Sequence, residues 1–373
     1  MNRTSLKIGT LFGIPVRVHI SWLLVFALVT VSLGSAYFPL TYPHWSPTLD
    51  WVLGAVTSLL FFASVLLHEL AHSVVAQRRG LPVRDIQLFV FGGVSEITRE
   101  PATPRTELFM AVVGPLTSLA LGLGCTLLRP LGQALSQPLG AVLAYVGEIN
   151  LALGFFNLIP GFPLDGGRVL RALLWWRSRD LMTSTRWASR VGQAVAYGFM
   201  LTGIWQAFSG GLLNGLWLVF IGWFLDNAAQ TAYRQLAVQS LLAGHTVREI
   251  MARDCTAIRP EATLQEIVDN HILAQGRRCL PVVQGGTFLG LVTVHRIRGF
   301  PQQEWSNHTA REAMIPISDL RTIRASEGLV QALSEMAEDG VNQLPVLEDG
   351  QMVGLLTREN ITTFLSLKAE LRV

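Results

Sequence analysis

Residues 51–77 read WVLGAVTSLLFFASVLLHELAHSVVAQ, and Glu69 is the only Asp, Glu, Lys or Arg among them. About 20 apolar residues are enough for a helix to cross the hydrocarbon core of a bilayer, so this segment predicts a membrane-spanning helix. His68, Glu69 and His72 interrupt the apolar run near its carboxyl end. Ionisable side chains are costly at that depth and usually serve a function. The segment therefore predicts a membrane helix with a polar site in it.

Five further apolar stretches free of Asp, Glu, Lys and Arg, or nearly so, predict more spans. The chain has 373 residues, of which 15% are charged and 50% hydrophobic, against about 25% charged in an average soluble domain. This composition excludes a fully soluble, a disordered and a fibrous protein. We expect a multi-pass α-helical membrane protein with about six transmembrane helices and the lipid bilayer as a partner. The other five predicted spans are Ile20–Phe38, Leu108–Leu128, Leu139–Leu158, Val191–Phe208 and Leu213–Leu225.

The distribution of arginine predicts the orientation. Loops on the cytoplasmic side of a membrane are enriched in Lys and Arg. The loops after the first, third and fifth spans hold only Arg129, whereas the loops after the second and fourth hold eleven arginines. We therefore expect both termini in the cytoplasm. We also expect the spans to lie in a prokaryotic plasma membrane. The net charge of +3 gives no argument for nucleic acid as a partner. The eleven are Arg78, Arg79, Arg84, Arg99, Arg105, Arg168, Arg171, Arg177, Arg179, Arg186 and Arg190.

An internal repeat fills the last third of the chain. The segment Thr246–Met251 (TVREIM) matches Thr309–Met314 (TAREAM), and two later motifs recur at the same offset of 63 to 64 residues. Each copy combines an amphipathic helix, predicted over Leu264–Gln275 and Leu329–Asp339, with two short strands around a glycine turn. Two copies of one α/β unit are therefore expected. The recurring motifs are LPVV at 280–283, LPVL at 344–347, GLVT at 290–293 and GLLT at 354–357.

The repeat resembles a tandem pair of CBS modules over about residues 244–367. The resemblance implies an adenosine nucleotide in the cleft between the copies, often held by an Asp three residues after the last Thr of each copy. Here those positions hold Arg296 and Asn360. Nucleotide binding, homodimerisation and partner docking therefore all stay open. We expect a membrane domain over 1–228, a linker helix over 229–243, and the two CBS repeats over 244–304 and 305–373.

The motif His68-Glu-Leu-Ala-His72 predicts a zinc site. On a helix, residues i and i+4 share one face, so both imidazoles can reach one metal ion. Glu69 can contact the water in the open coordination position and act as a general base. A third protein ligand is needed, and the best candidate is Asp165 in the segment Asn157–Arg168 (NLIPGFPLDGGR). The alternative for Asp165 is the N-cap of a short helix that begins at Gly166.

These motifs resemble those of the site-2 proteases, intramembrane zinc metalloproteases, in their CBS-containing branch. The segment His68–Ser73 (HELAHS) matches the family's metal and catalytic motif, and Asn157–Gly166 matches its second signature. The resemblance implies zinc as cofactor, Asp165 as third ligand and Asn157 as a residue that positions the substrate or the oxyanion. Phe91-Gly-Gly-Val94 lies where the family has a membrane-associated strand.

The expected function is zinc-dependent cleavage of transmembrane segments of single-pass, membrane-tethered proteins, in regulated intramembrane proteolysis. The alternatives are a transporter or channel with a CBS regulator, and a relative that binds such proteins without cutting them. Residues 86–97 could pair with an extended substrate or form a structural re-entrant hairpin. Glu148, near the middle of the fourth span, could face a water-filled path or pair with an arginine.

Overall fold

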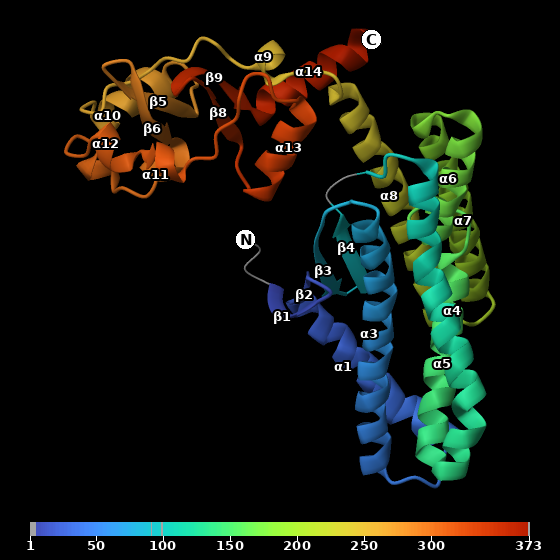
Figure 1. Ribbon diagram of the computed structural model, residues 1–373. Helices are drawn as coiled ribbons and strands as arrows, with labels where there is room; N and C mark the ends of the chain where they lie inside the picture. Colours follow the sequence, from blue (N-terminus) through green and yellow to red (C-terminus); the bar gives the residue numbers. More distant parts are fainter. Residues whose placement is uncertain (1–4, 91, 98–99, 372–373) are drawn as a thin grey trace. The chain divides into compact units, whose positions relative to one another are not determined.

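A computed structural model describes residues 5–90, 92–97 and 100–371, so Phe91 and Arg99 of the sequence argument lie outside the described residues. The chain divides into two compact units, Met1–Gln235 and Leu236–Val373. The boundary between them falls inside one helix, α8 (Leu212–Leu242). Each unit is described by itself below, and Figure 1 gives the element labels.

In the described residues, five helical segments are long and apolar enough to cross a membrane; four lie within the first unit, and the fifth runs from the first unit into the second. They are Ile20–Thr41, Pro47–Arg78, Pro104–Leu135, Gln137–Asn157 and Leu212–Leu242. The first comprises α1 (Ile20–Ser32), a π-helical turn (Leu33–Tyr37) and α2 (Phe38–Thr41); the next three are α3, α4 and α5. The predicted span Val191–Phe208 is helical within α7 (Leu181–Phe208). It is not among the five candidates, because glutamines and glycines dilute its apolar residues.

Local sequence sets where these helices begin. Ser46, Thr103 and Ser136 each accept a backbone N–H with their side chains and precede helices that have Pro in their first two positions. Both features are typical of helix N-termini. Glycine brings α4 against α5: a Cβ on Gly122 would lie 2.9 Å from the Gly147 carbonyl oxygen. Small residues permit such close approach in membranes, where no hydrophobic effect drives helices together.

A four-stranded sheet packs beside α3 (Figure 1). Its order is β1-β2-β3-β4, and β2 pairs with β3 in parallel while the other pairs are antiparallel. Ile14, Leu70 and Ile86 form the buried contact between sheet and helix. The strand predicted within 86–97 is the hairpin of β3 and β4, which leaves β4 at the sheet edge. The strands are β1 (Ser5–Leu11), β2 (Ile14–His19), β3 (Val83–Phe89) and β4 (Gly92–Ile97).

The second unit holds the two repeats. Its hairpins β5–β6 and β8–β9 pair in the same register 64 residues apart, and each has an irregularity at the equivalent position. The turns lie at the predicted glycines, with positive φ at Gly285, Gly286, Asp349 and Gly350. These strands are β5 (Cys279–Gln284), β6 (Thr287–Thr293), β8 (Gln343–Glu348) and β9 (Gln351–Thr357), and β7 (Ile315–Pro316) joins the first sheet.

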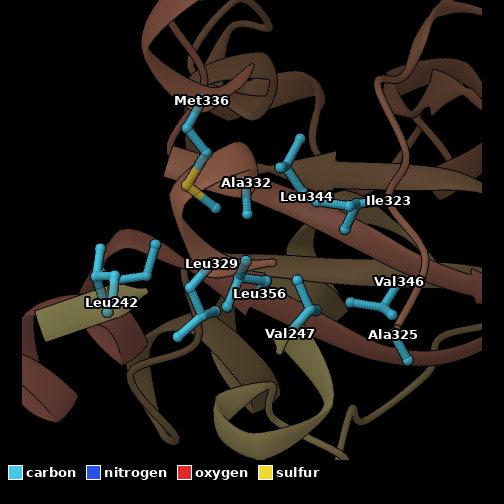
Figure 2. Close-up of a cluster of buried hydrophobic side chains, with 11 residues drawn as sticks. Leu242, Val247, Ile323, Ala325, Leu329, Ala332, Met336, Leu344, Val346 and Leu356 are labelled. Atoms are coloured by element: carbon cyan, nitrogen blue, oxygen red, sulfur yellow. The ribbon is translucent and has the colours of Figure 1, made fainter. Parts of the chain in front are cut away.

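Aliphatic side chains fill the core of each repeat. In the second repeat, Leu329, Met336, Leu344 and Leu356 are fully buried (Figure 2). The predicted helix of the first repeat is α10 followed by a π-helical segment, Val268–Leu273, and that of the second is α13. The helices of this unit after α8 are α9 (Val247–Ile250), α10 (Leu264–Ile267), α11 (Val294–Ile297), α12 (Ala310–Ala313), α13 (Leu329–Glu338) and α14 (Arg358–Leu371).

Candidate metal centre

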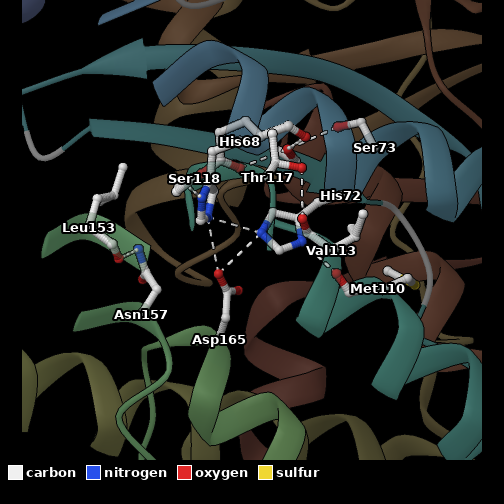
Figure 3. A network of polar contacts seen from close by, with 12 residues as sticks. His68, His72, Ser73, Met110, Val113, Thr117, Ser118, Leu153, Asn157 and Asp165 are labelled. Atoms are coloured by element: carbon white, nitrogen blue, oxygen red, sulfur yellow. Dashed lines mark hydrogen bonds and ion pairs between the residues drawn. The ribbon is translucent and has the colours of Figure 1, made fainter. Parts of the chain in front are cut away.

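His68 and His72 lie one turn apart on the same face of α3, as the i, i+4 spacing predicts. Each is 4% exposed. Their Nε2 atoms are 3.2 Å apart, and both rings are directed at Asp165 (Figure 3).

Helix α4 orients both imidazoles through their other nitrogen. His72 Nδ1 bonds to the Met110 carbonyl oxygen (2.5 Å), so Nδ1 carries a proton, and in the neutral ring the Nε2 lone pair is then available to a metal ion. His68 Nδ1 lies 2.9 Å from Ser118 Oγ. Between these two contacts stands Gly114, where an added Cβ would lie 2.1 Å from His72 Nε2 and 2.7 Å from His68 Nε2. The glycine therefore makes the room that the two rings occupy.

Asp165 completes a group of three candidate ligands. Its Oδ2 lies 3.1 Å from His68 Nε2 and 3.1 Å from His72 Nε2. It is the first residue of α6 (Asp165–Ser178), whereas the N-cap position belongs to Leu164, so the capping alternative does not describe its side chain. The glycine after it is required by packing, because a Cβ on Gly166 would lie 2.3 Å from the Ile159 carbonyl oxygen.

The three donor atoms suit a zinc ion. All lie within 4.8 Å of one another. Zinc bonds of about 2.0–2.2 Å to imidazole nitrogen and carboxylate oxygen place neighbouring ligand atoms of a tetrahedron roughly 3.3 Å apart. The observed separations of 3.1 and 3.2 Å match that spacing. Two neutral imidazoles and one carboxylate are also a common donor set for catalytic zinc.

Glu69 packs against strand β4. Ser95 Oγ lies 2.9 Å from Glu69 Oε2 and 3.1 Å from the Glu69 carbonyl oxygen, and Ser73 Oγ donates to Ser95 Oγ (2.9 Å). A Cβ on Gly93 would lie 2.4 Å from Glu69 Cγ, so β4 approaches the carboxylate closely only because that position is glycine. The sheet edge and the predicted general base are thus direct neighbours.

Asn157 ends α5, and its side chain makes a local bond. Its Nδ2 donates to the Leu153 carbonyl oxygen one turn back (3.1 Å) rather than to His68, His72 or Asp165. The structure therefore brings together the three predicted ligands but leaves Asn157 outside their hydrogen-bond network (Figure 3). Glu148 is exposed on α5.

Sequence reasoning misses a buried ion pair beside the site. Arg171 on α6 bonds through Nε and Nη2 to Glu107 on α4, and the two residues are 5% and 0% exposed. The predicted third span begins at Leu108, which places Glu107 in a loop, and Arg171 counts there only as a loop arginine. A signal is present, because charged residues within membrane segments usually pair with one another.

In the CBS unit, the two positions that replace the expected aspartates differ. Asn360 lies in the first turn of α14, where its Oδ1 accepts from the Thr357 backbone N–H (3.0 Å) and hydroxyl (2.7 Å), and its own backbone N–H donates to Thr357 Oγ1 (3.1 Å). The Arg296 side chain is exposed, and its backbone N–H donates to Thr293 Oγ1 (3.3 Å).

Comparison with known proteins finds matches for both the membrane unit and the CBS unit. The model for peptidase family M50 matches residues 56–132 and 124–201, and the CBS domain model matches 247–301 and 310–367. The chain is 33% identical to "Putative zinc metalloprotease sll0528" of Synechocystis over 98% of this chain and 96% of that protein. It is 32% identical to "Putative zinc metalloprotease Rip3" of Mycobacterium tuberculosis over 98% and 94%.

A solved structure of a site-2 protease from Methanocaldococcus jannaschii aligns at 30% identity and a TM-score of 0.42, over 61% of this chain and 95% of that one. The Synechocystis relative extends along nearly the whole of both chains, and its name is that of a zinc metalloprotease. The chain belongs to peptidase family M50, the site-2 protease family, and carries a pair of CBS domains.

Proposed function

We propose that the protein is a zinc-dependent intramembrane endopeptidase that cleaves the membrane-spanning segments of single-pass, membrane-tethered proteins. The observation that carries the proposal is the buried group of His68, His72 and Asp165, whose donor atoms converge at zinc-ligand spacing between apolar helices. Glu69 lies on the same helix beside the first histidine. Peptide hydrolysis is the chemistry that this combination serves in HExxH metalloproteases.

Each residue of the site has a proposed role. His68, His72 and Asp165 would hold one zinc ion, which when bound polarises the scissile carbonyl and acidifies water. Glu69 takes the proton of the attacking water and returns it to the leaving amine. Ser95 fixes one oxygen of that carboxylate through its 2.9 Å contact. Asn157 would have to release its bond to the Leu153 carbonyl before it could donate to an oxyanion.

The substrate must present an extended backbone, because a helix hides its peptide bonds in the i to i−4 hydrogen-bond ladder. Strand β4 is the edge of its sheet and adjoins Glu69. An unwound substrate segment could pair with that edge by strand addition and reach the metal. This is the role that we assign to residues 92–97.

We place the protein in the plasma membrane, and the arginine distribution supports an orientation in which both termini face the cytoplasm. The CBS pair would then be a cytoplasmic regulatory or dimerisation module. Since both expected aspartates are replaced, by Arg296 and Asn360, we leave its ligand as either an adenosine nucleotide or a partner chain.

The test is a comparison of protein fragments in cells that express the wild type or Glu69→Gln. Mass spectrometry of newly formed N-termini in the membrane fraction should find cuts within transmembrane segments of single-pass proteins for the wild type and none for the variant. Arg186→Met, at an exposed arginine of α7 outside the proposed site, is the matched control and should cut like the wild type. Equal fragments from wild type and Glu69→Gln, or cuts confined to soluble loops, would refute the proposal.

A further inference from the structure

The three candidate ligands lie on two helices, α3 and α6. A third helix, α4, contacts both of these helices and determines how they are placed relative to each other. His68 and His72 lie on α3, and both are oriented from α4, by Ser118 and the Met110 carbonyl. Asp165 lies on α6. The ligand geometry therefore depends on how α6 is placed against α4, and a shift of about 1 Å there would separate the carboxylate from the imidazoles, since metal sites tolerate only about 0.2 Å in ligand distance.

The ion pair of Arg171 and Glu107 fastens α6 to α4 at this place. Among the described residues, no other side-chain hydrogen bond joins α4 and α6. Glu107 is three residues before Met110 and so lies on the same face of α4, one turn from the atom that orients His72. Arg171 lies less than two turns after Asp165 on α6. On α4 the ion pair therefore lies near Met110, whose carbonyl oxygen orients His72. On α6 it lies near Asp165, the third candidate ligand.

The surroundings of Arg171 hold its guanidinium in one position. Its Nη2 also lies 3.2 Å from Glu100 Oε2, and its Cζ lies 5.2 Å from the centre of the Phe162 ring, in the segment that leads into α6. A planar guanidinium with two carboxylates and a ring face around it has a fixed direction, unlike a flexible ammonium group. Such a group can set a distance between helices as well as neutralise a charge.

We propose that Arg171 and Glu107 are positioning residues for the metal centre: they fix α6 on α4 so that Asp165 stays within reach of the two histidines. The inference rests on the proposed zinc function. It is separate from folding, because buried ion pairs often add little stability compared with apolar residues of similar size. The pair should therefore matter more for metal affinity than for the stability of the apoprotein.

The experiment measures zinc affinity of detergent-purified, metal-stripped full-length protein by competition with a chromophoric chelator, and the absorption spectrum after cobalt loading. Arg171→Met should raise the zinc dissociation constant about 10- to 100-fold, the range seen when supports of metal ligands are removed, and change the cobalt spectrum. Arg171→Lys keeps the positive charge but not the planar, forked geometry of the guanidinium. The zinc affinity of this variant should therefore fall between those of the wild type and Arg171→Met. Arg84→Met, at the exposed pair with Glu96, should match the wild type in both measurements.

A double variant, Glu107→Leu with Arg171→Met, removes both charges and guards against misfolding of the single variant. It should remain folded by size exclusion and still bind zinc more weakly. Wild-type zinc affinity and an unchanged cobalt spectrum in the folded double variant would refute the positioning role of Arg171 and Glu107 but not the proposed zinc function. A wild type that binds no zinc would refute both this inference and the proposed function.

Discussion

The two units of the chain bury different kinds of side chain. Among the described residues, every buried polar or charged one lies in the membrane unit, and the CBS unit has none. The CBS unit instead buries aliphatic side chains such as Leu264, Leu329 and Leu344. The buried polar residues of the membrane unit are Asp50, Thr57, Ser58, Ser64, His68, His72, Ser73, Asp85, Glu107, Ser118, Asn150, Arg171, Ser184, Thr185 and Ser189.

The difference follows from the solvent of each unit. In water, burial of apolar surface supplies the free energy of folding, so the CBS repeats need only matched aliphatic faces. In lipid, apolar contact between helices gains little of that energy, and association relies on close packing and on hydrogen bonds. The buried polar groups of the membrane unit can therefore contribute to helix association and to the metal centre, whereas the described cores of the CBS repeats form without buried polar side chains. Substitutions test this division directly.

The largest effect is expected at Asp165. Asp165→Ala leaves only the two histidines as protein ligands, too few for a stable zinc site. Metal analysis of the purified protein should fall from about one zinc per chain to almost none, and cleavage should stop. Glu69→Gln is the control, because it should keep zinc and lose cleavage by roughly 10²- to 10⁴-fold. A full zinc content in Asp165→Ala would show that another residue is the third ligand.

In the CBS unit, we expect the largest loss of stability when a buried apolar side chain is shortened. Leu344 is fully buried in the core of the second repeat, and Leu344→Ala should lower the free energy of unfolding by about 2–5 kcal/mol. Faster amide hydrogen exchange in β8 and β9 would report it, with zinc content unchanged. Leu367→Ala, at a leucine that is 52% exposed, should change stability by no more than about 0.5 kcal/mol. Equal effects of the two variants would contradict the described core.

A single methyl group should disturb the membrane site. Gly114→Ala places a Cβ 2.1 Å from the position of His72 Nε2, so the ring or α4 must shift. We expect zinc affinity to fall about 10- to 100-fold, as for other disturbed supports of metal ligands. Gly124→Ala in the same helix is the matched control, because nothing lies within 4 Å of its Cβ, and it should bind zinc normally. Unchanged affinity in Gly114→Ala would mean that α4 does not confine the histidines.

The smallest effect is expected at the surface of the CBS unit. The hydrogen bond of Glu312 to His308 (2.6 Å) raises the pKa of that histidine above its ordinary 6.5. Because the folded-state pKa is the higher one, the bond stabilises fully below pH 6.5 and is lost as pH rises through the raised value. The unfolding midpoint should therefore drop slightly between about pH 6 and pH 8, and His308→Gln should remove that slope. His295→Gln, at another exposed histidine, should retain it.

The sequence predicts the second unit more completely than the first. The repeat offset, the glycine turns and the helix over 329–339 all reappear in the structure, because each is a local pattern that one hairpin or one helix satisfies. In the first unit, the spacing of His68 and His72 is equally local, and the structure has both rings on one face. Asp165 can be named from its motif, but its approach to within 3.1 Å of both rings depends on contacts between helices far apart in sequence.

Other features of the membrane unit have weaker signals. Strands β1 and β2 are absent from the sequence prediction, although Ile14, Val16 and Val18 alternate with other residues after the turn at Phe12-Gly13. Ser95 and Ser118 look like ordinary polar residues. Their roles arise only when β4 and α4 come against α3, which no pattern within either segment reveals.

The parallel pairing of β2 with β3 sets an order of events during synthesis. Val16 pairs with Ile86, about 70 residues later, with two membrane segments between them. At translation rates of about 5–20 residues per second, β2 waits roughly 4 to 14 seconds for its partner strand. Strand β2 can therefore pair with β3 only after α1 and α3 have been synthesised, and until then β1 is its available partner. Each CBS hairpin, by contrast, has both of its strands within 15 residues and can close as soon as it emerges.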